Sequence, residues 1–336
     1  MNRKAVVLFN LGGPDGPKAI QPFLFNLFND RAILSIFQPF RSLLAFFIAR
    51  RRAKEAEAIY AQLGGGSPLL TNTQQQATAL EASLGKGWRV FIAMRYWHPL
   101  TDATVKAVKA YAPSEIILLP LYPQFSTTTT ASSIKAWITA AKKKALEIPT
   151  KIICCYPHHE GFIAANCDLI QPIIKSEKRP YRLLFSAHGL PEKIIRQGDP
   201  YQHHVELSSQ AIARRLGCKD FVVCYQSKVG PLKWLSPSID AEIKRAGQDR
   251  VGVIVVPLSF VSEHSETLVE LDIQYQTIAR TEKVPFYFRV PTVSKHPFFI
   301  NGLAEMIKSH QTELASGSPE FKCDPQFTNC ACRKVS

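Results

Sequence analysis

The sequence predicts an α/β protein with two similar halves, each built on a parallel β-sheet covered by helices. Three observations lead to this prediction. Eight short apolar runs end at Pro or polar residues, helix-like stretches separate them, and the runs divide four and four along the 336-residue chain. Runs that are apolar on both sides are typical of parallel strands buried between helices. At about 150 residues per domain, the length fits two domains.

The first half is expected to hold four of the strands, at Ala5–Leu11, Arg89–Met94, Glu115–Leu121 and Lys151–Tyr156. The second half is expected to hold the other four, at Arg182–Ala187, Asp220–Tyr225, Gly252–Val256 and Pro285–Val290. Helical composition and spacing are clearest in the intervening stretches Thr73–Leu84, Ala131–Lys144, Gly161–Ile174 and Ser208–Leu216. We expect the boundary near residues 160–178, and assign residues 1–160 to an N-terminal domain, 161–315 to a C-terminal domain and 316–336 to a cysteine-bearing extension.

Composition and charge narrow the classes of function. Apolar residues make up 46% of the chain and charged residues 20%, which excludes a disordered protein. The formal net charge of +14 favours an anionic partner, such as a substrate with carboxylates or an acidic membrane surface. No run reaches the roughly 18 apolar residues of a membrane span, and the first residues do not resemble a signal peptide, so we expect a cytoplasmic protein. Neither a G-x-G-x-x-G fingerprint nor a phosphate-binding P-loop motif occurs, which argues against a nucleotide-dependent enzyme.

The residues that follow the strands are the first candidates for a site, because ligands of open parallel sheets bind beyond the carboxyl ends of the strands. His188 directly follows one apolar run, in the sequence Ser-Ala-His-Gly-Leu-Pro. A structural, hydrogen-bonded histidine and a functional one are about equally compatible with this position. Helical spacing would put Glu263, Glu266 and Glu270 on one face, although acidic residues are also common at a solvated helix start. Imidazole and carboxylate together suit a divalent metal such as Fe²⁺.

Two further segments have an unusual composition. Residues Phe23–Arg52 hold seven Phe and end in three consecutive Arg, which is typical of an interfacial segment that meets anionic lipid. A lid that packs on its own domain explains the same pattern. Near the C-terminus, Cys323, Cys330 and Cys332 lie close together in an extension too polar for a core of its own. Three such thiols indicate zinc or an iron–sulfur cluster, with a fourth ligand from Cys154, Cys155, Cys167, Cys218 or Cys224.

Seven motifs, taken in order, resemble the ferrochelatase family, whose members insert Fe²⁺ into a porphyrin. They are Phe-Asn-Leu-Gly-Gly-Pro from residue 9, Gly-Gly-Gly-Ser-Pro from 64, Met-Arg-Tyr-Trp-His-Pro from 94, Leu-Tyr-Pro-Gln-Phe-Ser from 121, Ser-Ala-His-Gly-Leu-Pro from 186, Gln-Ser-Lys-Val-Gly-Pro from 226, and Glu-His-Ser-Glu-Thr-Leu from 263. The resemblance runs nearly end to end. It implies two similar Rossmann-like domains with a cleft between them.

The resemblance also implies roles for individual residues. His188 matches the family's active-site histidine and Glu266 the carboxylate that faces it across the porphyrin. Glu263 and His264 match neighbouring positions and complete the implied iron-binding set. The implied substrate-binding residues are Arg95, Tyr96, Ser126, Lys228 and Trp234, and Phe23–Arg52 matches the hydrophobic lip at the pocket mouth. Some members carry a 2Fe–2S cluster on three C-terminal cysteines and an internal one, which implies Cys167, Cys323, Cys330 and Cys332 here.

The function implied is the insertion of Fe²⁺ into protoporphyrin IX with release of two protons, the last step of haem biosynthesis. The lip implies peripheral attachment to the inner face of the cell membrane. No nucleic acid partner is expected, and the sequence leaves open whether the protein is a monomer or a homodimer. Two rival functions remain at this point: a chelatase for cobalt or nickel in another tetrapyrrole, and a haem carrier without turnover.

Overall fold

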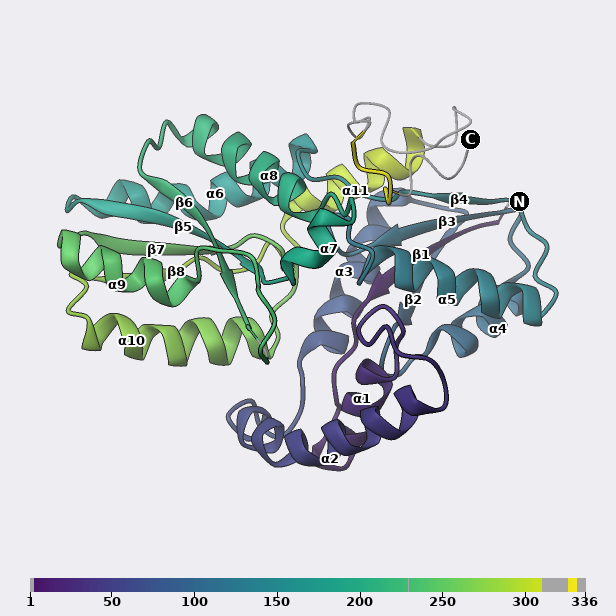
Figure 1. Cartoon of the computed structure of the whole chain (residues 1–336). Coiled ribbons are helices and arrows are strands. Elements are labelled where there is room, and N and C mark those ends of the chain that lie inside the picture. Colours follow the sequence, from purple (N-terminus) through teal and green to yellow (C-terminus); the bar gives the residue numbers. More distant parts are fainter. Residues whose placement is uncertain (1–2, 229, 310–325, 331–336) are drawn as a thin grey trace.

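The computed structural model describes residues 3–228, 230–309 and 326–330. Within these residues the chain forms two four-stranded parallel sheets, with strand orders β2-β1-β3-β4 and β6-β5-β7-β8 (Figure 1). The first sheet uses only the first half of the chain and the second sheet only the second half. The predicted fold class is therefore confirmed.

The first sheet consists of β1 (Lys4–Asn10), β2 (Trp88–Met94), β3 (Glu115–Pro120) and β4 (Thr150–Ile152). Alternation along β1 explains its two covered faces: Ala5 and Val7 pack against one set of helices, Val6 and Leu8 against another. The helices of this half are α1 (Pro17–Phe28), α2 (Phe40–Ala61), α3 (Leu69–Leu84), α4 (Thr101–Tyr111) and α5 (Thr130–Lys143). Helices α4 and α5 cover one face of the sheet, and α3 contributes to the cover of the other.

The second sheet repeats this plan with β5 (Tyr181–His188), β6 (Phe221–Gln226), β7 (Gly252–Pro257) and β8 (Tyr287–Arg289). Its helices are α6 (Glu160–Ser176), α7 (Glu192–Arg196), α8 (Tyr201–Leu216), α9 (Ile239–Asp249), the π-helix η1 (Glu266–Tyr275), α10 (Gln276–Thr281) and α11 (Pro297–Ser309). Helix α9, η1 and α10 pack on one face, and α6 and α8 on the other.

The inner faces of the two sheets share one apolar core. Leu8 and Leu119 of the first sheet belong to the same buried cluster as Phe185 and Val256 of the second. Helix α11 lies between the halves and packs against both α3 and α6 (Figure 1). As a result, the carboxyl ends of the strands of the two sheets lie on either side of the boundary between the two halves. The division into domains at residue 160 stays a prediction.

Two predicted strands are shorter than expected. β8 has three residues, Tyr287–Arg289, where the run Pro285–Val290 predicted six, and β4 is shortened in the same way. The apolar run Lys151–Tyr156 predicted six residues of strand, but β4 ends at Ile152. Ile153 donates one further hydrogen bond to Leu118, and Tyr156 then donates to Pro123, beyond the end of β3. The chain therefore leaves the sheet to follow the loop after β3. The residues in between, Cys154 and Cys155, lie in a loop and are buried there. A buried loop is as apolar in composition as a buried strand, so the sequence predicted a strand at this position.

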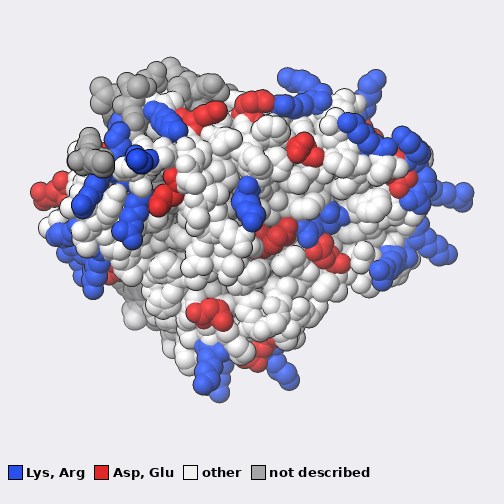
Figure 2. Space-filling model, turned by 180° about the vertical axis from the view of Figure 1, so that it is seen from behind, with Lys and Arg blue, Asp and Glu red and all other residues white. Residues whose placement is uncertain are grey.

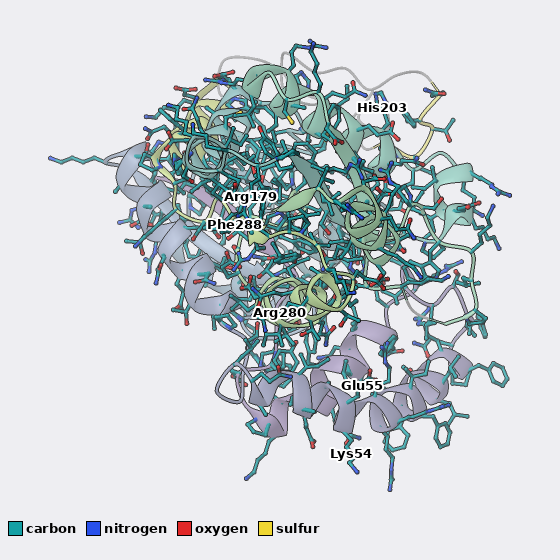
Figure 3. All side chains as sticks on the ribbon, turned by 90° about the vertical axis from the view of Figure 1, so that its left-hand side faces the viewer. Lys54, Glu55, Arg179, His203, Arg280 and Phe288 are labelled. Carbon is teal, nitrogen blue, oxygen red and sulfur yellow. The ribbon has the colours of Figure 1, made fainter. Side chains whose placement is uncertain are left out.

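The segment 23–52 has features of both an interfacial segment and a lid that packs on its own domain. Phe23 and Leu24 of α1 pack inside the N-terminal half, whereas Phe37, Phe40 and Leu43 are 80%, 65% and 58% exposed. Figure 3 shows α1 and α2 standing out below the body of the molecule, with Lys54 on the outer side of α2. No helix among the described residues combines the length and the apolar composition that crossing a bilayer requires.

The excess of basic residues is spread over the surface. On the face shown in Figure 2, Lys and Arg side chains lie mainly around the periphery, with Asp and Glu interspersed. A few side chains of each sign also lie near the centre of this face. On this face the basic side chains are therefore not gathered into one patch.

Candidate active site

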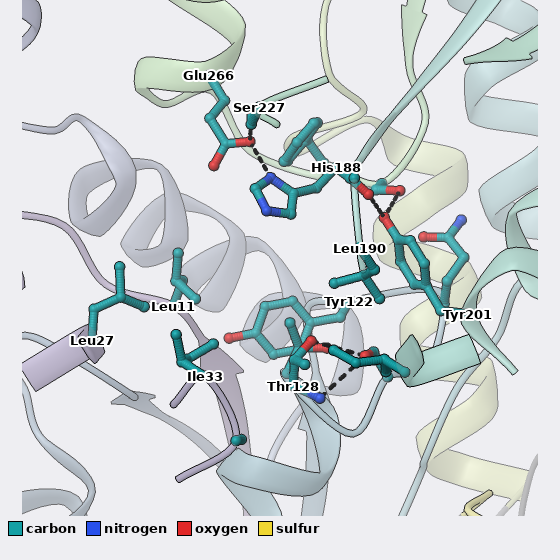
Figure 4. Close-up of a pocket in the computed structure, with 18 of the residues that line it drawn as sticks. Leu11, Leu27, Ile33, Tyr122, Thr128, His188, Leu190, Tyr201, Ser227 and Glu266 are labelled. Carbon is teal, nitrogen blue, oxygen red and sulfur yellow. Dashed lines mark hydrogen bonds and ion pairs between the residues drawn. The ribbon is translucent and has the colours of Figure 1, made fainter. Parts of the chain in front are cut away.

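A deep pocket of about 480 Å³ lies where the carboxyl ends of the strands from both halves meet (Figure 4). That volume falls in the range of pockets that bind cofactor-sized ligands. Its walls are mostly apolar, and they include residues of the lip, of the loops after β3 and β5, and of the segment before η1. Representative lining residues are Leu11, Leu27, Ile33, Leu34, Leu121, Leu190, Ile194, Leu232, Trp234 and Val261.

His188 and Glu266 face into this pocket and contact each other. His188 is the last residue of β5, and Glu266 is the first residue of η1. Nδ1 of His188 lies 2.7 Å from Oε2 of Glu266, and the Ser227 hydroxyl donates to the same oxygen at 3.1 Å (Figure 4). The backbone of His188 is fixed as well, because the Tyr201 hydroxyl donates to its carbonyl at 2.9 Å. An imidazole and a carboxylate are thus held together at the wall of an apolar pocket.

Each member of this pair stabilises the charged form of the other. Burial by itself would lower the pKa of His188, but the negative charge of Glu266 and the hydrogen bond to it raise that pKa above its usual value. Burial opposes ionisation of Glu266 too, yet the charge of His188 and its hydrogen bond hold the pKa of Glu266 well below its usual range. The two shifts have opposite signs, as expected for two groups that stabilise each other's charged form.

A second carboxylate stands behind this pair. Glu270 lies four residues further along η1, where the wider turn of a π-helix keeps it close to Glu266. The Ser227 hydroxyl lies 2.7 Å from Oε2 of Glu270, and Gln226 donates to the same oxygen. Burial, together with the charge of Glu266, raises the pKa of Glu270 to about 7. Glu270 therefore exchanges protons near neutral pH.

His264 also lines the pocket, next to Glu266. Its Nδ1 lies 3.1 Å from the carbonyl oxygen of Ser262, so the other ring nitrogen, Nε2, points toward Glu266 at 3.9 Å. The ring packs on Phe260 with the centroids 4.7 Å apart. Burial lowers the pKa of His264, which favours its neutral form. A neutral imidazole is the form that binds metals.

Glu263 lies elsewhere, although helical spacing had placed it on one face with Glu266 and Glu270. It precedes η1, and its Oε1 accepts hydrogen bonds from Arg289 at 2.6 Å and from the backbone of Thr292 at 2.9 Å. Arg289 also binds both carboxylate oxygens of Asp272. Glu263 and Asp272 therefore attach the two parts of this segment to β8, and Glu263 does not line the pocket.

The substrate-binding residues implied by the resemblance separate into two groups. Ser126 and Trp234 line the pocket. Arg95 and Tyr96 lie behind it, because both donate to the buried carboxylate of Asp30, at 2.7 and 2.8 Å. This bonding anchors the lip loop whose next residues form part of the pocket wall. Lys228 is exposed to solvent and does not belong to the lining.

Arg52 is a pocket residue that the sequence did not single out. It is the one Lys or Arg side chain of the pocket lining in the described part of the chain. Its guanidinium lies 5.9 Å from the ring centre of Phe28, which also lines the pocket. The three consecutive Arg at residues 50–52 suggested lipid binding as a group, and only the rotation of α2 decides which of them faces inward.

Of the four implied cluster cysteines, the structure describes Cys167 and Cys330. Cys323 and Cys332 lie outside the described residues. Cys330 is fully buried in a small cluster with Cys154, Cys155 and Phe125. Cys167 is buried in the main core instead, where its thiol lies near the carbonyl of Ile212 and burial raises its pKa to about 11. Cys167 and Cys330 therefore lie in different buried clusters. No group of three or more His, Cys, Asp or Glu arranged for a metal is present within the described ranges.

Comparison with known proteins agrees with this geometry. The family model named Ferrochelatase matches residues 3–311. The chain belongs to the ferrochelatase family. The ferrochelatase of Caulobacter vibrioides is 49% identical over 98% of this chain and 97% of its own length. That of a Wolbachia symbiont of Drosophila simulans is 51% identical over 90% of this chain and 98% of its own.

Members of the ferrochelatase family are metal chelatases, and this chain is an enzyme of that kind. Solved structures support the fold. SirB from Bacillus subtilis with Fe³⁺ superposes with a TM-score of 0.55 over 91% of this chain and 95% of that one, at 12% identity. A cobalt complex of the sirohydrochlorin chelatase SirB gives a TM-score of 0.53. Identity this low shows the shared two-domain chelatase fold alone.

Proposed function

We propose that the protein inserts Fe²⁺ into protoporphyrin IX, releasing two protons and forming protohaem, as the last step of haem biosynthesis. The observation that carries the proposal is the His188–Glu266 pair at the wall of a large apolar pocket. Fe²⁺ and the porphyrin are both substrates. The proposed iron-binding groups are Glu266 and the neutral imidazole of His264, and His188 is the proposed proton acceptor.

The chemistry requires a bent macrocycle. A planar porphyrin directs its nitrogen lone pairs inward, and two of its nitrogens carry protons. A pocket that fits the bent ring better than the flat one lowers the barrier, because bending exposes the lone pairs to the metal. The pocket walls come from both halves of the protein and from the lip, so the ring would be held from several sides.

Two protons must leave the ring as iron enters. Neutral His188 accepts one of these protons in this proposal, and Glu266 stabilises the imidazolium that results; Glu270 in its ionised form accepts the other. The Ser227 hydroxyl connects Oε2 of Glu266 with Oε2 of Glu270, whose pKa of about 7 suits proton release near neutral pH. Because the pKa of His188 is raised, haem formation should increase with pH as this imidazole loses its proton.

The lining favours protoporphyrin over a porphyrin with more carboxylates. Protoporphyrin has two propionates and an otherwise apolar rim, whereas coproporphyrin has four propionates. Arg52 is the one Lys or Arg of the described pocket lining and would pair with one propionate. A mostly apolar wall would leave additional carboxylates without partners, which is costly in a desolvated pocket.

The proposal is tested by anaerobic incubation with Fe²⁺ and protoporphyrin IX, with haem followed by its absorption. We expect His188→Ala to abolish haem formation while porphyrin binding, measured by fluorescence, persists. His296→Ala is a matched control, because His296 pairs with Asp168 and lies outside the pocket lining. Full activity of the His188 variant would refute the site. Preference for Co²⁺ or Ni²⁺ with another tetrapyrrole, or haem binding without turnover, would refute the function.

A 2Fe–2S cluster is a second part of the proposal. The donor set fits in part: Cys330 is buried beside two further cysteines, Cys154 and Cys155, whose sulfurs lie 3.5 Å apart. We place the cluster on Cys323, Cys330, Cys332 and one of these two. When bound, such a cluster supplies one-electron redox chemistry. Replacement of Cys154 and Cys155 by Ser, one at a time, should abolish the cluster's visible absorption in one variant, and retention in both would contradict this placement.

Peripheral attachment to the inner face of the cell membrane is the third part. Phe37, Phe40, Leu43 and Phe47 are more than half exposed at the tip of the lip. Exposed aromatic and aliphatic side chains flanked by Arg are typical of segments that insert into an anionic bilayer surface. This placement would open the pocket mouth toward the membrane, from which an apolar porphyrin could enter.

A further inference from the structure

Asp199 is a buried carboxylate that the proposed chemistry does not use. It lies between α7 and α8 and is 1% exposed. Within the described residues no ion pair joins it to a basic side chain. Oδ2 instead accepts hydrogen bonds from the backbone and hydroxyl of Thr127, at 2.7 and 2.6 Å, and from the hydroxyl of Ser126 at 3.1 Å. Oδ1 accepts from the backbone of Tyr201 at 3.0 Å.

These bonds connect two walls of the pocket that come from different halves of the chain. Ser126, Thr128 and Thr129 line the pocket from the loop after β3. Tyr201 lines it from the start of α8, and its hydroxyl holds the carbonyl of His188. In Figure 4, Thr128 and His188 lie on different sides of the pocket, with Tyr201 beside His188. The carboxylate of Asp199 thus connects these two walls.

Outside the pocket, the segment 326–330 packs against the residues that flank Asp199. Asn329 donates from its side chain to the carbonyl of Gln197 at 2.6 Å. A Cβ at Gly198, which has a φ of +89°, would lie 2.6 Å from the hydroxyl of Thr328, so glycine is required at this contact. Phe327 packs against His203, with ring centroids 5.1 Å apart, near the start of α8 (Figure 3). None of the residues 326–330 lines the pocket.

We propose that Asp199 is a positioning residue for the tetrapyrrole, which fixes the separation of the Ser126–Thr129 wall from the wall carrying His188 and Tyr201, and that segment 326–330 braces this joint from outside. The inference rests on the proposed function. It predicts a selective effect on the porphyrin, because the His188–Glu266 contact depends on Ser227 and η1, on the other side of His188.

Asp199→Asn is the decisive variant. Its amide group has one acceptor oxygen, and the NH₂ must face either the backbone N–H of Thr127 or that of Tyr201, neither of which can reorient. We therefore expect the KM for protoporphyrin to rise about tenfold, which corresponds to about 1.4 kcal/mol of porphyrin binding free energy lost when the wall is displaced. The KM for Fe²⁺ should stay within about twofold of wild type, since the iron-binding groups keep their contacts.

The Asp199→Asn variant should still fold, because two other contacts between the halves remain. Gln124 donates to Ser208, and the backbone of Phe125 donates to His204. Thr127→Val is a milder variant, since it removes one hydroxyl bond and leaves the backbone bond. We expect about a threefold rise in the KM for porphyrin. Asn329→Ala should act in the same direction through the brace. Asp220→Asn is the matched control, as Asp220 pairs with Arg182 at the opposite end of β5.

Porphyrin affinity is measured by fluorescence without iron, and both KM values by anaerobic haem formation. A KM for porphyrin within twofold of wild type in the Asp199 variant overturns the inference, and so does an equal rise of both KM values, which a general loss of structure would produce. A wild-type protein that neither binds nor converts protoporphyrin refutes the proposed function itself. Normal wild-type turnover with an unaffected Asp199 variant refutes this inference alone.

Discussion

Replacing Glu266 by Gln tests whether this carboxylate controls the protonation of His188. The substitution keeps the size of the side chain and removes its charge. A hydrogen bond to a charged group contributes about 1.5–3 kcal/mol, and one pKa unit corresponds to about 1.36 kcal/mol. The His188 side chain is 40% exposed, so solvent screening favours the lower end of that range. We expect the pKa of His188 to fall by about one unit, because burial, which lowers it, is then opposed less.

The assay is an NMR titration of isotope-labelled histidine, with the His188 signal assigned by its absence in His188→Ala. Glu115→Gln is the control, because Glu115 begins β3 at the far end of the first sheet, where it pairs with Lys151, and should leave His188 unchanged. The pH profile of haem formation should shift toward lower pH in the Glu266 variant, in addition to any loss of rate. An unchanged pKa of His188 in that variant would show that the contact does not set its charge state.

Three further results are expected. In the same Glu266→Gln variant the pKa of Glu270 should fall from about 7 toward its usual value, since the neighbouring negative charge is lost. An NMR titration of the Glu270 carboxyl measures this pKa, and an unchanged value would contradict the prediction. Cys330→Ser should remove the visible absorption of the cluster whereas Cys167→Ser retains it, and the reverse result would restore Cys167 as a ligand. Phe37→Ser should weaken binding to anionic vesicles about tenfold, as sedimentation would measure, because an inserted Phe contributes about 1.5–3 kcal/mol; equal binding would argue against insertion of the lip.

Much of the site was predictable because local sequence and topology agree there. Six of the eight apolar runs became strands close to their predicted ends, and His188 directly follows one of these runs. The position of Glu263 was not predictable in the same way. Regular helical spacing grouped it with Glu266, but the helix begins only at Glu266 and is a π-helix, so Glu263 turns to Arg289 on β8. That partner lies 26 residues along the chain, beyond the reach of any local pattern.

The sequence by itself determined the two parallel sheets, the rim of loops at their carboxyl ends and the family, because buried strands and short motifs are local properties. Only the tertiary structure decided which side chains meet. It turned Arg52 inward on α2, moved Arg95 and Tyr96 behind the wall onto Asp30, and brought Cys330 to Cys154 and Cys155. The physical reason is that side chains from distant segments meet through the packing of helices and loops, and a step of one residue along a helix is enough to exchange a pocket residue for a surface residue.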